Sequence, residues 1–100
     1  MEFLLKYNLT SEEIEYIEKM NSENTLQNIK MNLVNVTSVI DYLLGLGITT
    51  ETLKELFVHQ IGIFHKTKAE IEQVFDEYEI ESIVKSLNFD VNTIDLIEFN

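Results

Sequence analysis

The sequence lacks cysteine and arginine, and each absence excludes a kind of site. Without cysteine there is no disulfide framework, no thiolate zinc site and no cysteine nucleophile. Without arginine there is no planar guanidinium group for bidentate recognition of phosphate or guanine. No apolar run approaches the ~20 residues that a membrane-spanning helix needs. The first residues, MEFLLKYNLT, carry an acidic residue where a signal peptide has a basic one, so we expect a cytoplasmic protein that does not bind membranes.

Basic residues are also scarce. Seven lysines stand against 18 acidic residues, which gives a formal net charge of −11. A charge this negative repels nucleic acid and anionic membrane surfaces, so it disfavours nucleic acid as a partner. The 100 residues, 45% of them hydrophobic, suit one globular domain with a modest core.

One short pattern occurs three times, at residues 9–17 (LTSEEIEYI), 48–56 (ITTETLKEL) and 89–97 (FDVNTIDLI). In each copy an apolar residue precedes a Thr or Asp, and the next apolar residue comes five positions after the first. Such a pattern is typical of a helix start, with the Thr or Asp as N-cap and the two apolar residues packed as a hydrophobic staple. Thr10 with Glu13 completes a capping box in the first copy.

The segments between these starts also correspond. Shifting residues 33–56 by 41 positions aligns their apolar positions with those of 74–97, so that Leu43 meets Val84 and Ile48 meets Phe89. This period indicates a small right-handed stack of helices built from a repeat of roughly 40 residues. A chance alignment of two amphipathic patterns is the alternative. The single domain, 1–100, would contain units at about 9–47 and 48–88 and a partial unit at 89–100.

The apolar spacing predicts about five helices and no strand, so the expected fold class is all-α. Gly45 or Gly47 is expected to end the second helix, and the fourth should break near Glu79, where the apolar phase shifts. Residues 61–67 are expected to form a connector, and Thr67 with Glu70 a second capping box. The expected helices are at about 10–20, 25–45, 50–59, from 67 onward, and 91–98.

No residue pattern predicts catalysis, a metal or a cofactor. His59 and His65 are six positions apart, whereas metal ligands on a helix are usually spaced by three or four. The dense acidic run from Glu70 to Glu81 suits a solvated helix face better than a catalytic carboxylate pair, which needs a cleft that shifts its pKa values.

Two surface clusters are nevertheless candidates for binding a partner. The acidic candidate is the face formed by Glu70, Asp76, Glu77 and Glu81. The basic candidate is a small patch of Lys54, Lys66 and Lys68, for which three ordinary solubilising lysines are the alternative.

The segments YLLGLGITTETLKELF and IGIFHKTKAEIEQVF resemble one repeat of the mitochondrial transcription termination factor-like helical proteins, and residues 80–97 resemble the start of the next repeat. The resemblance, over residues 39–97, implies helices stacked into a superhelix that binds nucleic acid through a basic concave face. The family's connector usually carries a proline and its binding face is rich in arginine, and this chain has neither residue. The resemblance therefore supports the fold alone.

Three functions follow from these observations. The first is a non-enzymatic protein–protein interaction module, whose partner is another protein or a second copy of the chain. The second is an acidic nucleic-acid mimic or inhibitor, of the kind that phages encode, which binds a nucleic-acid-handling enzyme. The third is direct nucleic-acid binding through the three lysines.

Overall fold

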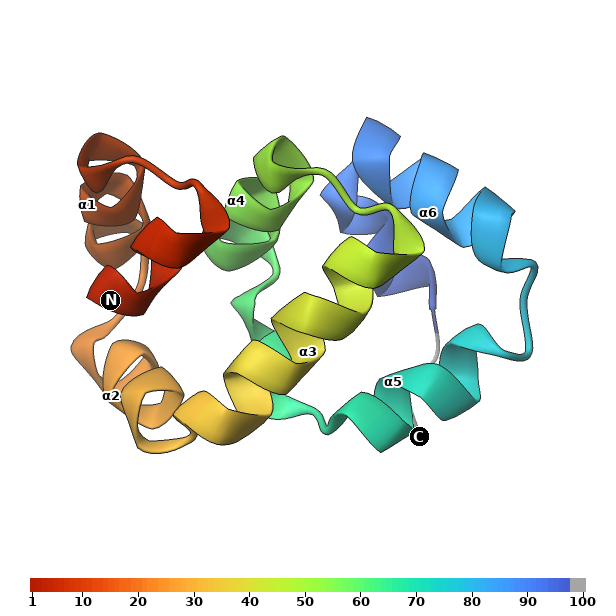
Figure 1. Ribbon diagram of the computed structural model, residues 1–100, viewed down its shortest axis with the longest axis horizontal. Coiled ribbons are helices and arrows are strands. Elements are labelled where there is room, and N and C mark those ends of the chain that lie inside the picture. The colour runs from red at the N-terminus through yellow and green to blue at the C-terminus, as the bar shows by residue number, and fades with distance from the viewer. Residues whose placement is uncertain (98–100) are drawn as a thin grey trace.

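The computed structural model describes residues 1–97 and is all-helical over that range, which confirms the predicted fold class. Its extents are 34 × 23 × 22 Å. Figure 1 shows the central helix α3 crossing the front of the molecule, with α1 and α2 at one end and the turn between α5 and α6 at the other. The described residues form six α-helices and three short 3₁₀ helices (η): η1 (Glu2–Tyr7), α1 (Ser11–Met20), α2 (Glu23–Met31), α3 (Leu33–Leu46), α4 (Thr50–His59), η2 (Ile61–His65), α5 (Lys68–Phe75), α6 (Ile80–Phe89) and η3 (Val91–Leu96).

The predicted helix starts at Thr10, Thr49 and Thr67 are confirmed, because each threonine is the N-cap of the helix that follows. Thr67 Oγ1 accepts a hydrogen bond from Glu70 N (3.1 Å), and Glu70 Oε1 accepts one from Thr67 N (2.9 Å). Thr10 and Glu13 form the same capping box. The hydrogen bond from the backbone N–H of the threonine lowers the pKa of the partner glutamate in both boxes.

The end of α3 is also as predicted. Gly47 adopts a left-handed conformation with φ of 111°, and its N–H and that of Ile48 donate to carbonyls of the last helical turn. This conformation favours glycine, since a Cβ would strain the backbone. A Cβ on Gly47 would also lie 3.4 Å from Val84 Cγ1.

The single helix expected at 25–45 is instead two helices, α2 and α3. The described residues form six α-helices, one more than the five helices expected. The chain breaks at Asn32, whose φ and ψ of −125° and 35° are not helical. The side chain of Asn32 donates to the carbonyl oxygen of Asn28 (2.9 Å). An asparagine that bonds a nearby carbonyl competes with the helical hydrogen-bond pattern, which accounts for the break. The break predicted near Glu79 is confirmed, because α5 ends at Phe75 and α6 begins at Ile80.

The third copy of the pattern begins a 3₁₀ helix and not an α-helix. Asp90 Oδ1 accepts from Asn92 N (2.9 Å), so Asp90 is a cap, but the element that follows it is the 3₁₀ helix η3. Residue 98, the last of the helix predicted at 91–98, lies outside the described residues. Phe89, expected to pack, is 92% exposed, whereas Leu9 and Ile48 at the same place in the other copies are 3% exposed.

The helix geometry explains why Phe89 faces solvent. Leu87 is buried on the inner side of α6. Phe89 follows it by two residues, a rotation of roughly 200° about the helix axis, which places Phe89 on the opposite side. The staple predicted for the third copy is therefore wrong.

The segments paired by the 41-residue shift contain different elements. Residues 33–46 are the single helix α3, whereas the corresponding residues 74–87 include the end of α5, a turn and most of α6. The α-helix α4 corresponds to the 3₁₀ helix η3. The repeat-based description of the fold is not confirmed.

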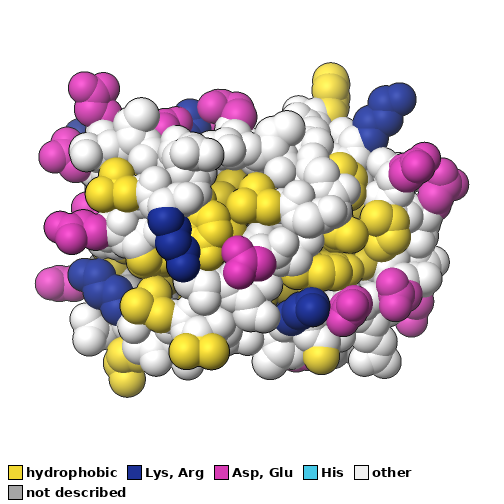
Figure 2. Space-filling model, viewed as in Figure 1, with side chains coloured by type: hydrophobic (Ala, Val, Ile, Leu, Met, Phe, Trp, Pro, Cys, Tyr) yellow, Lys and Arg dark blue, Asp and Glu magenta, His cyan; other side chains and the backbone are white. Residues whose placement is uncertain are grey.

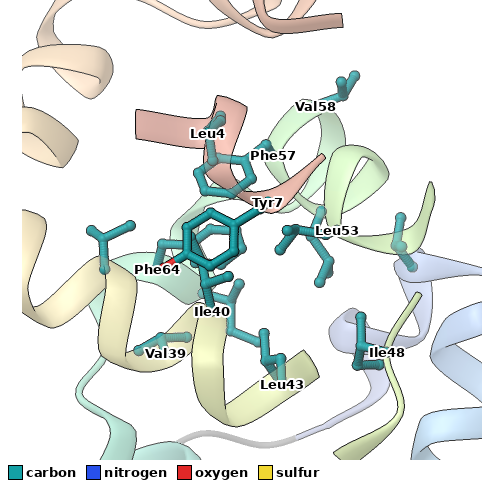
Figure 3. Packing of buried hydrophobic residues seen from close by; sticks show 14 of the residues in the cluster. Leu4, Tyr7, Val39, Ile40, Leu43, Ile48, Leu53, Phe57, Val58 and Phe64 are labelled. Carbon is teal, nitrogen blue, oxygen red and sulfur yellow. The ribbon is translucent and has the colours of Figure 1, made fainter. Parts of the chain in front are cut away.

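Figure 3 shows the part of the core that lies between η1, α3, α4 and η2, and buried residues of the other helices continue it. The fully buried rings of Phe57 in α4 and Phe64 in η2 stack, with centroids 4.0 Å apart and ring planes 7° apart. Burying two such rings is a major source of stability in a domain of this size.

Asparagine side chains also join segments that are far apart in the sequence. Each donates an amide N–H to a backbone carbonyl of another element, where helix ends leave carbonyls without an intrahelical partner. The pairs are Asn21 Nδ2 with Phe57 O (2.9 Å), Asn35 Nδ2 with Lys66 O (2.8 Å) and Asn88 Nδ2 with Gly47 O (3.1 Å), the last reinforced by Thr49 N donating to Asn88 Oδ1 (3.1 Å).

Candidate interaction surfaces

The four residues of the acidic candidate do not lie on one side of α5. Glu70 and Glu77 line the same small hollow, of about 80 Å³, together with Gln73 and Val74. Asp76 instead lies near Tyr42 of α3, whose pKa is raised by burial and then by the charges of Glu72 and Asp76. Glu81 is exposed in the first turn of α6. The structure thus groups Glu70 with Glu77 and turns Asp76 toward another face.

The three lysines of the basic candidate are likewise divided. Lys54 Nζ in α4 is 3.1 Å from Glu51 Oε1 and 3.6 Å from Glu55 Oε1, so two carboxylates already balance its charge. Lys68 Nζ is 5.8 Å from the ring centroid of Tyr42 in α3. The backbone carbonyl of Lys66 accepts the side chain of Asn35. Lys54 thus has different neighbours from the two lysines near the start of α5.

The two histidines lie on different elements and have different surroundings. His59 Nε2 is 3.3 Å from Glu55 Oε2, one turn earlier in α4, and His65 lies exposed at the end of η2. Among residues 1–97, no group of three or more His, Asp or Glu side chains is placed to hold a metal ion.

An apolar surface surrounds the helix break at Asn32. Val34 is 87% exposed and Met31 is 72% exposed, and Leu33 between them is partly exposed. Val34 and Ser38 line two adjoining hollows of about 590 and 460 Å³. We name this surface the Val34 face; its residues are Lys30, Met31, Asn32, Leu33, Val34, Asn35, Thr37, Ser38, Asp41, Tyr42 and Lys68.

A separate hollow, of about 320 Å³, lies between α4 and the junction of α6 with η3. Its lining combines the buried side chains of Leu87 and Val91 with the exposed ring of Phe89. Carboxylates from α4 and from the cap of η3 also line the hollow. We name this the Phe89 hollow; its charged and titratable residues are Glu51, Glu55, His59 and Asp90.

Sequence patterns alone did not identify either surface. Val34 and Phe89 both fell on apolar positions of the supposed repeat, which favoured a place in the core. For Phe89 the available signal was its rotation relative to Leu87. For Val34 the signal was Asn32, a poor helix former at the centre of a long predicted helix.

Tyr7 is a buried side chain with an unusual hydroxyl group. The residue is 9% exposed, and its Oη has no hydrogen-bond partner in the part of the chain that the structure describes. Burial, together with the nearby charge of Asp41, raises the pKa of Tyr7 to about 12. The Asp41 carboxylate raises the pKa further, by its charge and as a nearby acceptor for the phenol, although the two side chains do not reach hydrogen-bond geometry.

Comparisons of the chain with family models, with curated proteins and with solved structures give no match. The resemblance to the termination factor-like repeats therefore stays a prediction. None of the helices in residues 1–97 combines the length and the apolar character needed to span a membrane.

Proposed function

We propose that this protein is a non-enzymatic interaction module that docks another protein on the Val34 face. The observation that supports this function is the exposure of Val34 and Met31, at 87% and 72%, beside two hollows. Large apolar side chains that adjoin hollows on an otherwise polar surface are typical of docking sites. Burying a Val or a Met side chain in a partner would contribute about 1.5–3 kcal/mol each.

The distribution of charge also favours docking at this place. Figure 2 shows most of the acidic side chains in view toward the two ends of the long axis, while the middle carries mainly hydrophobic side chains, with some lysines and a few acidic side chains. The Val34 face itself contains Lys30, Lys68 and one carboxylate, Asp41. A neutral or mildly acidic partner surface can therefore approach here despite the net charge of −11.

The experiment compares Val34→Asp with a matched control, Leu96→Asp. Leu96, in η3, is exposed to a similar degree (80%) and lies on a different surface. Tagged parent and variants are used to capture partners from the native cell, and light scattering measures self-association. We expect the parent and Leu96→Asp to bind the same partner, or a second copy, and Val34→Asp to lose it. Equal binding by all three proteins, or a strict monomer with no captured partner, would exclude this docking face.

A second candidate function is the acidic mimic, which binds a nucleic-acid-handling enzyme. The grouping of Glu70 with Glu77 in one hollow favours it, because a mimic needs neighbouring carboxylates. The charge-removing variant Glu70→Gln/Glu77→Gln should then weaken inhibition of such an enzyme, and added salt should do the same. Inhibition unchanged by the variant would exclude this face as the mimic.

Direct nucleic-acid binding has the least support, because Lys54 is already paired with Glu51 and Glu55. A gel-shift assay at low salt tests this function. A complex of the parent with nucleic acid that Lys66→Gln/Lys68→Gln weakens would support binding through these lysines.

A further inference from the structure

We propose that the Phe89 hollow binds a cationic side chain, arginine or lysine, carried by a basic segment of a partner protein. The hollow lies apart from the Val34 face and shares no lining residue with it. It is therefore a second site, and its existence does not depend on docking at Val34.

The shape of the hollow suits a long side chain with an apolar stem and a charged end. Leu87 of α6 and Val91 of η3 line the hollow but are only 1% and 6% exposed, so most of its accessible apolar surface comes from Phe89. Phe89 stands at the edge with its ring almost wholly in solvent. The methylene groups of arginine or lysine commonly pack on such apolar surfaces while the charged group stays near water.

The charge of the hollow selects a cation. Glu51 and Glu55 come from α4 and Asp90 from the cap of η3, so carboxylates face the hollow from two elements. Lys54 balances part of this charge through its contacts with Glu51 and Glu55, and His59 contacts Glu55. Three carboxylates against one lysine still leave a negative site. The face of the Phe89 ring adds a further attraction for a cation.

Other ligand classes fit less well. The same carboxylates repel the phosphates of nucleic acids and anionic lipids. An uncharged apolar ligand would leave the carboxylates facing an apolar surface, which is costly. A basic protein segment satisfies both the apolar and the acidic parts of the lining.

The test uses a fluorescein-labelled peptide of six Ala-Arg repeats as probe, with Ala-Lys and Ala-Gln peptides of the same length as comparisons. Fluorescence anisotropy at low salt measures the dissociation constant for the parent and for Phe89→Ala/Glu51→Gln. The control is Leu96→Ala/Glu81→Gln, which removes one exposed apolar side chain and one exposed carboxylate elsewhere. Circular dichroism checks that both variants keep the parent's helix content.

We expect the Arg and Lys peptides to bind the parent and the Gln peptide not to bind. Phe89→Ala/Glu51→Gln should weaken binding by about tenfold, from the loss of one cation–π contact and one charge contact. The control should change binding by about twofold or less, through net charge alone. Amide NMR shifts on addition of the Arg peptide should cluster at residues 88–92 and along α4.

Two results would overturn the proposal. One is equal weakening by the two double variants, which would assign the binding to the overall charge of −11. The other is no binding of either cationic peptide, or NMR shifts confined to α1 or α5. Val34→Asp should change peptide binding by about twofold or less, through net charge alone, so the outcome here is independent of the docking experiment at Val34.

Discussion

Replacing Tyr7 with phenylalanine removes a buried hydroxyl group that makes no hydrogen bond within residues 1–97. A buried hydroxyl without a partner loses its hydrogen bonds to water on folding, at a cost of about 1–3 kcal/mol. The ring itself, in the core with Phe57 and Phe64, is kept in the variant. We therefore expect Tyr7→Phe to raise the free energy of unfolding at neutral pH by about 1 kcal/mol.

The same substitution should change how stability depends on pH. The pKa of Tyr7 in the folded protein is about 12, against 10.0 for a free tyrosine, so the folded state holds this proton more tightly than the unfolded state. The raised pKa therefore contributes to the free energy of unfolding. This contribution is fully present below pH 10 and is lost as pH rises through the pKa of the folded state. The full difference in pKa corresponds to about 3 kcal/mol of unfolding free energy, of which about half is lost by pH 11.

Urea denaturation at pH 7, 9 and 11 measures both effects, with Tyr16→Phe as control for the loss of an exposed phenol. Between pH 9 and 11 the parent should lose about 1 kcal/mol more stability than Tyr7→Phe. Absorbance of the phenolate at 295 nm should show one late-titrating tyrosine that disappears in the variant.

Two results would refute this reasoning. A loss of more than about 1 kcal/mol in Tyr7→Phe at neutral pH would mean that the hydroxyl makes a hydrogen bond, since a satisfied one contributes about that much. If the difference in unfolding free energy between the parent and Tyr7→Phe stays constant from pH 9 to 11, the pKa of Tyr7 is not raised by burial.

Three further substitutions test the fold by thermal and urea unfolding. Phe64→Ala should lower stability by about 3–5 kcal/mol, because it empties a fully buried site stacked on Phe57; a loss below about 1 kcal/mol would contradict the stacked core. Gly47→Ala should cost about 1–2 kcal/mol, because φ is 111° there and Val84 Cγ1 is 3.4 Å from the new Cβ; Gly62→Ala, with open space around the new Cβ, is the control. Thr67→Ala should cost about 1 kcal/mol through loss of the cap on α5, and Thr67→Ser should restore most of it if the hydroxyl is the cause.

The parts of the fold that sequence patterns predicted correctly depend on contacts within a few residues. The caps at Thr10, Thr49 and Thr67 act on an N–H three residues ahead. The end of α3 at Gly47 depends on the backbone freedom of a single residue. Such local features are readable because both partners lie inside one short window of sequence.

The features that were missed depend on distant parts of the chain. Asn88 bonds Gly47 and Thr49 about 40 residues earlier, and no local pattern marks an asparagine for that role. The predicted acidic face differs from the structure for a local reason. Spacing along one helix suggested a shared face, but α5 ends at Phe75, so Asp76 and Glu77 belong to a turn with its own direction.

The two proposed surfaces have opposite electrostatic preferences, and this bears on how the protein could use them. The Val34 face carries Lys30 and Lys68 with a single carboxylate, whereas the Phe89 hollow is lined by Glu51, Glu55 and Asp90. One uniformly charged partner surface cannot satisfy both, so simultaneous use requires two partners or a partner with segments of different charge.

Salt should separate the two modes of binding. Docking at Val34 depends mainly on apolar burial, which moderate salt leaves nearly unchanged. Binding of a cation in the Phe89 hollow depends on exposed charges, which are largely screened beyond the Debye length of about 8 Å at physiological salt. A complex that survives added salt and is lost with Val34→Asp therefore uses the first surface, and one that salt and Phe89→Ala both weaken uses the second.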